Sequence, residues 1–264
     1  MSGTPVRDPV LAIGRTFALA AALVCLAPLP LLLAIATSPA WQRGAWAGGF
    51  TLRWLAESWR SVGPHLGTSL ALAALTLALN IAIGLPAAWA LARRDFPGRR
   101  TLQALAGLPL ALPGIALALA LTLAYPGWRA GGWLLAAGHL LYTLPFFVGA
   151  LTTALADPAL REAEAVAATL GARGVQRLVF VTLPAVRQAL LAAGVMVVTL
   201  SLGEFNVTFF LVTPLAKTLP VDLYTAYLTG RIELAAAATV WFLLLVLPAA
   251  VAIERLGGAR VGQG

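Results

Sequence analysis

Glu204 is an ionisable residue well inside a long apolar stretch, residues 189–212. An isolated charge in the bilayer costs about 2.5 kcal/mol or more, so such a residue usually faces a helix bundle or a water-filled cavity. Two roles stay open: a residue on a solute path that attracts a cation, or a structural carboxylate that accepts hydrogen bonds across helices. The polar residues that could line such a path are Ser201, Glu204, Asn206, Thr208 and, from another apolar stretch, Asn80.

The remaining groups that could do chemistry are isolated from one another. His65 and His139 are far apart in the sequence and far from any pair of carboxylates, so neither a metal site nor acid–base catalysis is expected. The single cysteine, Cys25, excludes an intramolecular disulfide and a cysteine-rich metal site. Asn80 can join two helices by hydrogen bonds or contact a solute, and the first role is the favoured one. The sequence therefore predicts no catalytic residue and no bound metal.

A polar segment between two apolar stretches, residues 153–188, has the pattern of a docking loop. Strong helix formers fill residues 162–170, and Gly171 is expected to end or bend that helix. A second short helix is expected over 175–181, ending before Pro184, because the residue before a proline disfavours the α conformation. The two short helices are expected to meet at an angle on the inner face of the membrane.

The surface of this loop suits contact with another protein. Alanines on the first helix give a smooth face that a partner can approach closely, and Arg173 and Arg177, four residues apart, share one side of a helix. The alternative is a loop that lies on lipid alone. The residues that we assign to docking are Glu162, Glu164, Ala165, Ala167, Ala168, Gly171, Arg173, Arg177, Leu183 and Pro184.

Membrane helices must hold these residues, because the composition excludes a water-surrounded globule. Hydrophobic residues make up 60% of the 264 and charged residues only 11%, where a soluble domain carries about 25%, and the mean hydropathy is +0.89. A bilayer core needs about 20 apolar residues per helix. We therefore expect an all-α, polytopic bundle of six transmembrane helices in a single domain, residues 1–264, with kinks at Pro109, Pro113 and Pro145. The expected spans are about 17–36, 66–92, 102–124, 131–152, 189–212 and 234–253.

The basic residues predict the orientation of the spans. Eighteen Lys and Arg against ten Asp and Glu give a net charge of +8. With the N-terminus inside, twelve of the eighteen fall on the cytoplasmic side, including four arginines in residues 93–100, so both termini are expected inside. Contact with the lipid surface then accounts for the positive charge, and nucleic-acid binding is not expected. The first span exceeds the usual length of a signal-peptide core, so we expect it to remain as a membrane helix.

Residues 165–171 read AVAATLG, and Leu183-Pro184 follows, with the proline thirteen positions after Gly171. This pattern resembles the EAA loop of binding-protein-dependent ABC importer permeases. The position of the family's glutamate, six before the glycine, holds Ala165, and Glu164 comes one residue early. The resemblance implies that, if the glutamate contact with the ATPase is kept, Glu164 supplies it from a rotated position.

The resemblance extends over about residues 50–254. Six further segments look like the second permease subunit of spermidine/putrescine-type importers, although iron, thiamine, sulfate and aminoalkylphosphonate permeases share much of the pattern. These segments are residues 50–54, 91–99, 108–114, 138–146, 203–211 and 218–221.

This resemblance implies a type I ABC importer permease fold and a subunit of an ATP-driven importer. Its implied partners are a cytoplasmic ABC ATPase dimer, a second permease subunit that is a different chain, an external solute-binding protein and membrane lipid. The implied location is the inner (plasma) membrane of a bacterial-type cell. The permease would do no chemistry and bind no cofactor, because ATP and Mg belong to the ATPase; consistently, the sequence has no Walker A lysine motif.

The solute that the resemblance favours is a polyamine, of the spermidine/putrescine type. Iron, thiamine, sulfate or aminoalkylphosphonate import are the alternatives within the family. A stand-alone secondary transporter or channel would need a coupling-ion site in this chain, for which only Glu204 is available. An intramembrane enzyme would need a catalytic dyad, and the sequence offers none.

Overall fold

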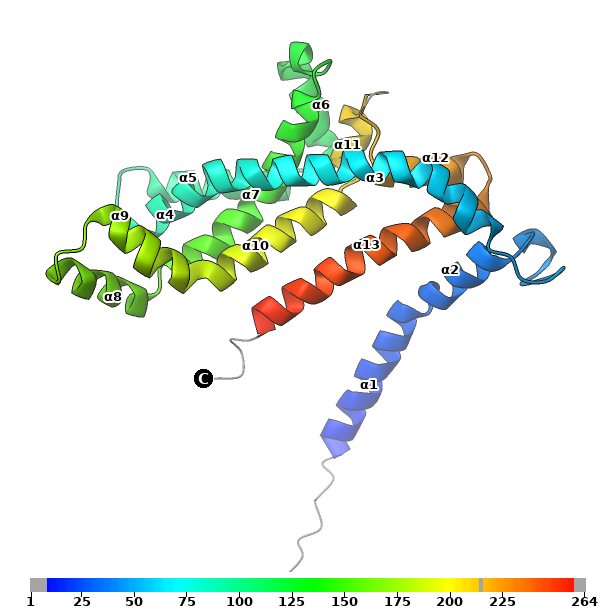
Figure 1. The fold of residues 1–264 in the computed structure, drawn as a ribbon, viewed down its shortest axis with the longest axis horizontal. Coiled ribbons are helices and arrows are strands. Elements are labelled where there is room, and N and C mark those ends of the chain that lie inside the picture. Colours follow the sequence, from blue (N-terminus) through cyan, green and yellow to red (C-terminus); the bar gives the residue numbers. More distant parts are fainter. Residues whose placement is uncertain (1–8, 214–215, 259–264) are drawn as a thin grey trace, which may run out of the picture. The chain divides into compact units, whose positions relative to one another are not determined.

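The structure is a computed structural model that describes residues 9–213 and 216–258 of the chain. Within these residues the protein is helical throughout and contains no strand, as the composition predicts (Figure 1). The chain forms two compact units. One comprises Met1–Arg60 with Thr225–Trp241, and the other comprises Ser61–Tyr224 with Phe242–Gly264.

The helices follow one another with few irregular segments. Two π turns, Asn80–Gly84 and Leu178–Thr182, lie within the longest helical runs, and two 3₁₀ turns cover Trp41–Arg43 and Pro126–Trp128. The α-helices are α1 (Pro9–Leu26), α2 (Pro28–Thr37), α3 (Arg53–Leu79), α4 (Leu85–Arg93), α5 (Arg99–Ala111), α6 (Gly114–Ala124), α7 (Trp133–Leu155), α8 (Pro158–Thr169), α9 (Gly174–Arg177), α10 (Leu183–Gly203), α11 (Asn206–Leu211), α12 (Leu219–Leu228) and α13 (Ile232–Gly258).

In the first unit, the end of α2 packs against the part of α13 that precedes residue 242. The loop after α2 is tied to the same helix, because N of Trp41 donates a hydrogen bond to Oε1 of Glu233 at 2.8 Å. Small side chains in the core let the helix backbones approach closely. The buried core residues of this unit are Ala36, Ala236 and Ala237.

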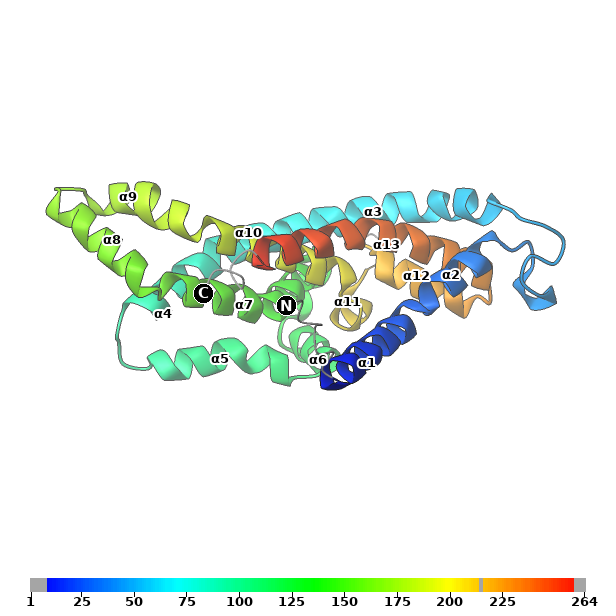
Figure 2. The ribbon, with the colours of Figure 1, turned by 90° about the horizontal axis from the view of Figure 1, so that it is seen from below.

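The second unit is organised around α7, which packs against α4, α10 and α11 (Figures 1 and 2). One apolar core joins α4, α7, α8 and α10 and includes Leu91 and Phe147. A second core joins α6, α7 and α11 and includes Leu134 and Val207. The helices α8 and α9 lie at one end of this unit, away from α11 (Figure 2). The first helix of the predicted docking loop, α8, thus shares an apolar core with α7, which also packs against α10 and α11.

Each π turn lies directly before a Leu-Pro pair. In the second turn, N of Leu183 donates to O of Leu178, five residues back, and Pro184 follows inside α10. The sequence prediction that the short helix ends before Pro184 is therefore wrong: Gly174–Gly203 forms one helical run of 30 residues. A proline normally clashes with the carbonyl four residues earlier, and the wider π turn relieves that clash.

Four helical runs in the described residues are long and apolar enough to cross a membrane, or five if α5 and α6 together form one span. These two helices cover the predicted span 102–124 and meet at an angle of 109°, with the expected kink at Pro113. The helices α5 and α7 continue through Pro109 and Pro145, and the kinks expected there stay predictions. The run that contains the predicted span 66–92 begins earlier, at Arg53. Charged residues in its first turns do not end the helix, because they reach solvent or pair with other side chains. The count of six spans and the orientation with both termini inside stay predictions.

Candidate functional site

The first helix of the predicted docking loop, α8, is fixed at both ends by its own sequence. Asp157 caps its first turn. At the other end Gly171 has a φ of +84°, the left-handed conformation that favours glycine. N of Gly171 donates to O of Ala168, and N of Ala172 donates to O of Ala167, both at 3.0 Å. The predicted helix end at Gly171 is confirmed, and it matches the usual glycine-terminated pattern.

The outer surface of the loop is apolar and exposed. Leu170 and Val175, on either side of Gly171, are 83% and 73% exposed, and Ala165 and Ala168 are exposed as well. Apolar side chains gathered on the tip of a polar loop are typical of a protein-binding surface. We name these four residues, Ala165, Ala168, Leu170 and Val175, the docking face.

The other predicted docking residues divide into two groups by burial. Glu162, Arg173 and Pro184 are exposed. The remaining residues are half-buried and contact the protein's own helices. They are Glu164, Ala167, Arg177 and Leu183.

Glu164 is engaged within the chain. Its Oε1 atom accepts hydrogen bonds from Nη2 of Arg93 at 2.9 Å and from Oγ1 of Thr182 at 2.6 Å. One turn earlier on the same side of α8, Nη2 of Arg161 donates to O of Ala92 at 2.5 Å. The inner side of α8 is thus fastened to the last turn of α4 and to the π turn before α10.

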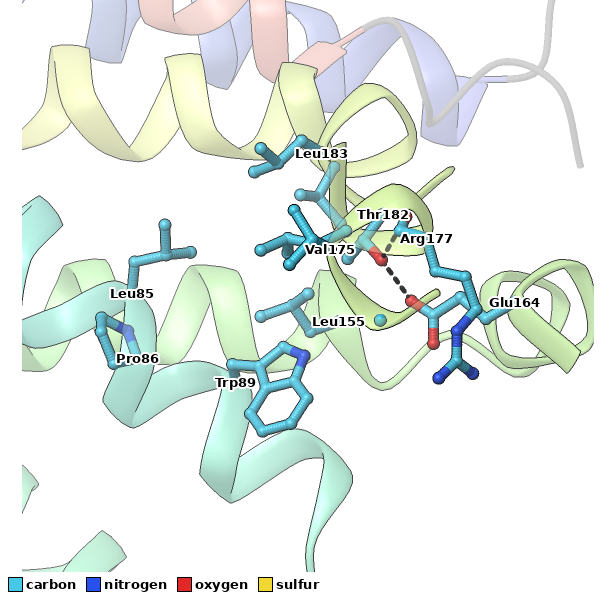
Figure 3. A pocket seen from close by; sticks show the side chains of 12 residues that line it. Leu85, Pro86, Trp89, Leu155, Glu164, Val175, Arg177, Thr182 and Leu183 are labelled. Carbon is cyan, nitrogen blue, oxygen red and sulfur yellow. Dashed lines mark hydrogen bonds between the residues drawn. The ribbon is translucent and has the colours of Figure 1, made fainter. Parts of the chain in front are cut away.

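A cavity of about 660 Å³ lies between α4 and the helical run that begins at Gly174. Figure 3 shows Leu85, Pro86 and Trp89 on one side of it and Val175 and Leu183 on the other. The walls are therefore mostly apolar. The hydrogen-bonded side chains of Glu164 and Thr182 line one end of the cavity. The Leu-Pro pairs that follow the two π turns border this cavity, through Leu85, Pro86 and Leu183.

Glu204 interrupts the predicted span 189–212, because α10 ends at Gly203 and α11 begins at Asn206. Its Oε1 accepts from N of Val207 at 2.8 Å, and its Oε2 accepts from N of Thr208 at 2.7 Å. The carboxylate therefore caps the first turn of α11 and is only 5% exposed. These hydrogen bonds are local to residues 204–208 and do not reach another helix directly, so both roles, on the solute path and as a structural carboxylate, stay predictions.

His139 links this cap to the neighbouring helices. Its Nε2 lies 2.7 Å from Oγ1 of Thr208, and its Nδ1 lies 2.8 Å from Oγ of Ser201. Because Thr208 Oγ1 also lies 2.8 Å from Oε2 of Glu204 and donates to it, we assign Nε2 of His139 as the donor to Thr208, and a neutral imidazole then accepts from Ser201 through Nδ1. The four side chains form a hydrogen-bonded chain through α7, α10 and α11.

The chain of hydrogen bonds continues to the first π turn. Nδ2 of Asn80 donates to Oγ1 of Thr143 at 2.8 Å, and Oγ1 of Thr143 donates to O of His139 at 2.8 Å. All six side chains of this polar network, Asn80, His139, Thr143, Ser201, Glu204 and Thr208, are at most 5% exposed. The predicted role of Asn80 in joining helices agrees with these contacts. Asn206, in contrast, is exposed and has no hydrogen bond to these residues.

Sequence reasoning missed the centre of the network, because it treated His139 as isolated. A weaker signal was present: Asn80, His139 and Ser201 each lie in a different apolar stretch, and buried polar groups require partners. Such residues are expected to form hydrogen bonds with one another when they lie at the same depth in the membrane. Sequence alone does not give those depths, so the partnership could not be assigned.

No protein-family model matches the chain. It is 30% identical over 215 residues to the sulfate transport system permease protein CysW of a Synechocystis species, covering 75% of this chain and 77% of the relative. It is 31% identical over 202 residues to a probable molybdenum ABC transporter permease protein of Haloferax volcanii, covering 72% and 73%. The chain belongs to the permease proteins of ABC transporters. A putative 2-aminoethylphosphonate transport system permease protein, PhnV of Salmonella typhimurium, shares 28% identity with this permease over 89% of this chain and 90% of the relative.

The fold of the permease has a counterpart among solved structures. A bacterial ABC transporter involved in the import of the acidic polysaccharide alginate superimposes with a TM-score of 0.69 over 97% of this chain and 99% of the other. The sequence identity is 14%, so the match concerns the fold alone. The expected ABC importer permease fold is thereby confirmed. The polyamine expectation receives no support from the relatives named above.

Proposed function

We propose that this chain is the permease subunit of an ATP-driven importer for a small oxyanion. The similarity to the sulfate, molybdenum and 2-aminoethylphosphonate permeases carries the proposal. Sulfate, molybdate and the phosphonate group are all tetrahedral oxyanions, so one solute chemistry is common to three relatives. In this proposal, a second permease, a different chain, completes the path, and an external binding protein delivers the solute.

The hydrogen bonds of Glu204 count against a polyamine path. A polyamine path would benefit from a free carboxylate, and Glu204 is the acidic residue that the sequence offered for it. Both of its oxygens accept backbone hydrogen bonds, and the group is buried. A carboxylate that is buried and already bonded in this way is not presented as a free ligand for the ammonium groups of a polyamine.

The loop supports the proposed partnership with a cytoplasmic ATPase dimer. The docking face exposes Leu170 and Val175 at the turn that Gly171 makes between α8 and α9. Burying such side chains against a partner is favourable by about 25 cal/mol per Å² of apolar surface. ATP and Mg would belong to the ATPase, and this chain would do no chemistry itself. We place the complex in the inner (plasma) membrane.

The proposal is tested by uptake into proteoliposomes that contain this chain, its partner permease and the ATPase, together with the binding protein. We expect ATP-dependent uptake of sulfate, molybdate or 2-aminoethylphosphonate, and no uptake of spermidine. ATP-dependent spermidine uptake without anion uptake would overturn the oxyanion assignment. Uptake by this chain alone, without ATPase, would overturn the importer assignment in favour of a stand-alone transporter.

A further inference from the structure

We propose that Glu164 is a positioning residue that makes the docking helix α8 move as one body with α4 and α10. This inference rests on the proposed docking of an ATPase at the loop. Oε1 of Glu164 accepts from Arg93, the last residue of α4, and from Thr182, the last residue of the π turn before α10. A single oxygen atom on α8 is therefore hydrogen-bonded both to the end of α4 and to the π turn that precedes α10.

Burial separates this role from direct contact with a partner. The side chains of Arg93 and Glu164 are 9% and 19% exposed, whereas Leu170 of the docking face is 83% exposed. The carboxylate faces the protein's own helices, whereas Ala165, Ala168 and Leu170 of the docking face are exposed. Val175, the fourth residue of that face, is exposed but also borders the cavity beside Glu164. Glu162, two residues earlier on α8, is exposed and has no hydrogen bond or ion pair with any described residue. A partner that binds this loop would meet Glu162 before Glu164.

The second contact of α8 with α4 makes the joint stiff. Arg161 donates to O of Ala92, a carbonyl in the last turn of α4 that has no partner within its helix. Arg161 and Glu164 are three residues apart and so lie on one side of α8. Leu160, beside them, is buried in the core that α8 shares with α4 and α7. Three adjacent anchors leave α8 little freedom to rotate on α4.

The hydrogen bond between Glu164 and Thr182 connects α8 to the π turn Leu178–Thr182 of the long helical run. Oγ1 of Thr182 also lies 3.3 Å from O of Arg177, on the opposite side of the π turn, and Figure 3 shows both interactions. A displacement of α8 therefore reaches the run Gly174–Gly203 directly through a side chain. It does not depend on the bend at Gly171 for its transmission.

The test measures the distance between spin labels on α8 and α10 in the full chain. Labels are attached to Ala163→Cys and Arg187→Cys, which are exposed positions, in a Cys25→Ala background. Losing a charge-assisted hydrogen bond allows alternative arrangements to be populated, so Glu164→Gln is expected to broaden the distance distribution about twofold.

Three further variants separate positioning from general damage. Thr182→Val should broaden the distribution as Glu164→Gln does, and Thr182→Ser, which keeps the hydroxyl, should restore the narrow one. Glu162→Gln makes the same chemical change on the same helix at a position without a partner, so the distribution should stay narrow.

The same labelled proteins are measured in the purified complex with the ATPase, with and without ATP and vanadate. With Glu164 intact, the distance is expected to be equal in both states; in Glu164→Gln it should differ between them. A narrow, unchanged distribution in Glu164→Gln would overturn the proposal. So would loss of the ATPase from that variant with the distribution still narrow, because Glu164 would then be a docking contact. If the unsubstituted chain binds no ATPase, the proposed function fails, while the distances in the chain alone still decide the role of Glu164.

Discussion

Nε2 of His139 lies 2.7 Å from Oγ1 of Thr208, although 69 positions separate the two residues in the sequence. The contact joins the middle of α7 to the short helix α11, whose first turn Glu204 caps. A helix of six residues is too short to be stable by itself, so α11 depends on such contacts. The break between α10 and α11 is therefore stabilised by His139, which lies on a different helix, α7.

Replacing His139 with leucine is expected to destabilise the permease by about 1–3 kcal/mol, because it leaves the buried hydroxyl of Ser201 without its partner, while Thr208 keeps its bond to Glu204. Thermal unfolding in detergent measures the effect. His65→Leu is the control: the side chain of His65 is 27% exposed, so its loss should cost much less. Equal effects of the two substitutions would show that the polar network does not stabilise the fold.

Replacing Glu204 with alanine is expected to cost about 1–2 kcal/mol, the usual value for loss of a helix cap. Glutamine should have an intermediate effect, because it keeps one acceptor oxygen. In the assembled importer, transport should decline in parallel with the amount of assembled complex. Asn206→Ala, at an exposed position, is the control and should change stability by less than about 0.5 kcal/mol. Transport lost with stability and assembly intact would instead make Glu204 a residue of the solute path.

Replacing Leu170 with aspartate is expected to lower the amount of ATPase that co-purifies with the chain by at least about tenfold. The substitution places a charge where the partner's apolar surface would lie. The unfolding temperature of the chain alone should not change, because Leu170 is 83% exposed. Co-purification with a tagged ATPase measures the association. Leu170→Met keeps the apolar character and should keep the ATPase bound. If the aspartate variant also keeps it, the docking face lies elsewhere.

Replacing Gly171 with alanine is expected to cost about 1–2 kcal/mol, because a φ of +84° brings the added Cβ close to the following carbonyl. Gly174→Ala is the matched control. No heavy atom lies within 4 Å of the Cβ that would be added there, and the residue begins a helix, so the same change should be neutral or slightly stabilising. Thermal unfolding of the two variants measures the difference. Equal shifts in unfolding temperature would contradict this explanation.

Features with local causes could be predicted from the sequence. The membrane class follows from composition, and the end of α8 follows from one glycine after a run of helix formers. The family resemblance was also sound, because it rested on the order and spacing of several segments.

Features with distant causes could not be predicted. The continuation of the helix through Pro184 depends on a π turn, and a sequence pattern does not distinguish a relieved proline from a helix-ending one. The engagement of Glu164 depends on Arg93, 71 positions away, and that of His139 depends on Ser201 and Thr208. In each case, tertiary packing selects among local options that the sequence leaves open.

The π turns also have a consequence for the direction in which distant side chains point. A π turn holds more residues than an α turn, and successive residues of an α-helix are about 100° apart around its axis. Deleting one residue within Leu178–Thr182 would let this segment close as an ordinary α turn, so the later side chains of α10 would keep their directions and Ser201 would still face His139. The π turn thus accommodates one additional residue beside the surface that we assign to the ATPase, and the hydrogen bonds at the other end of the helix keep their register.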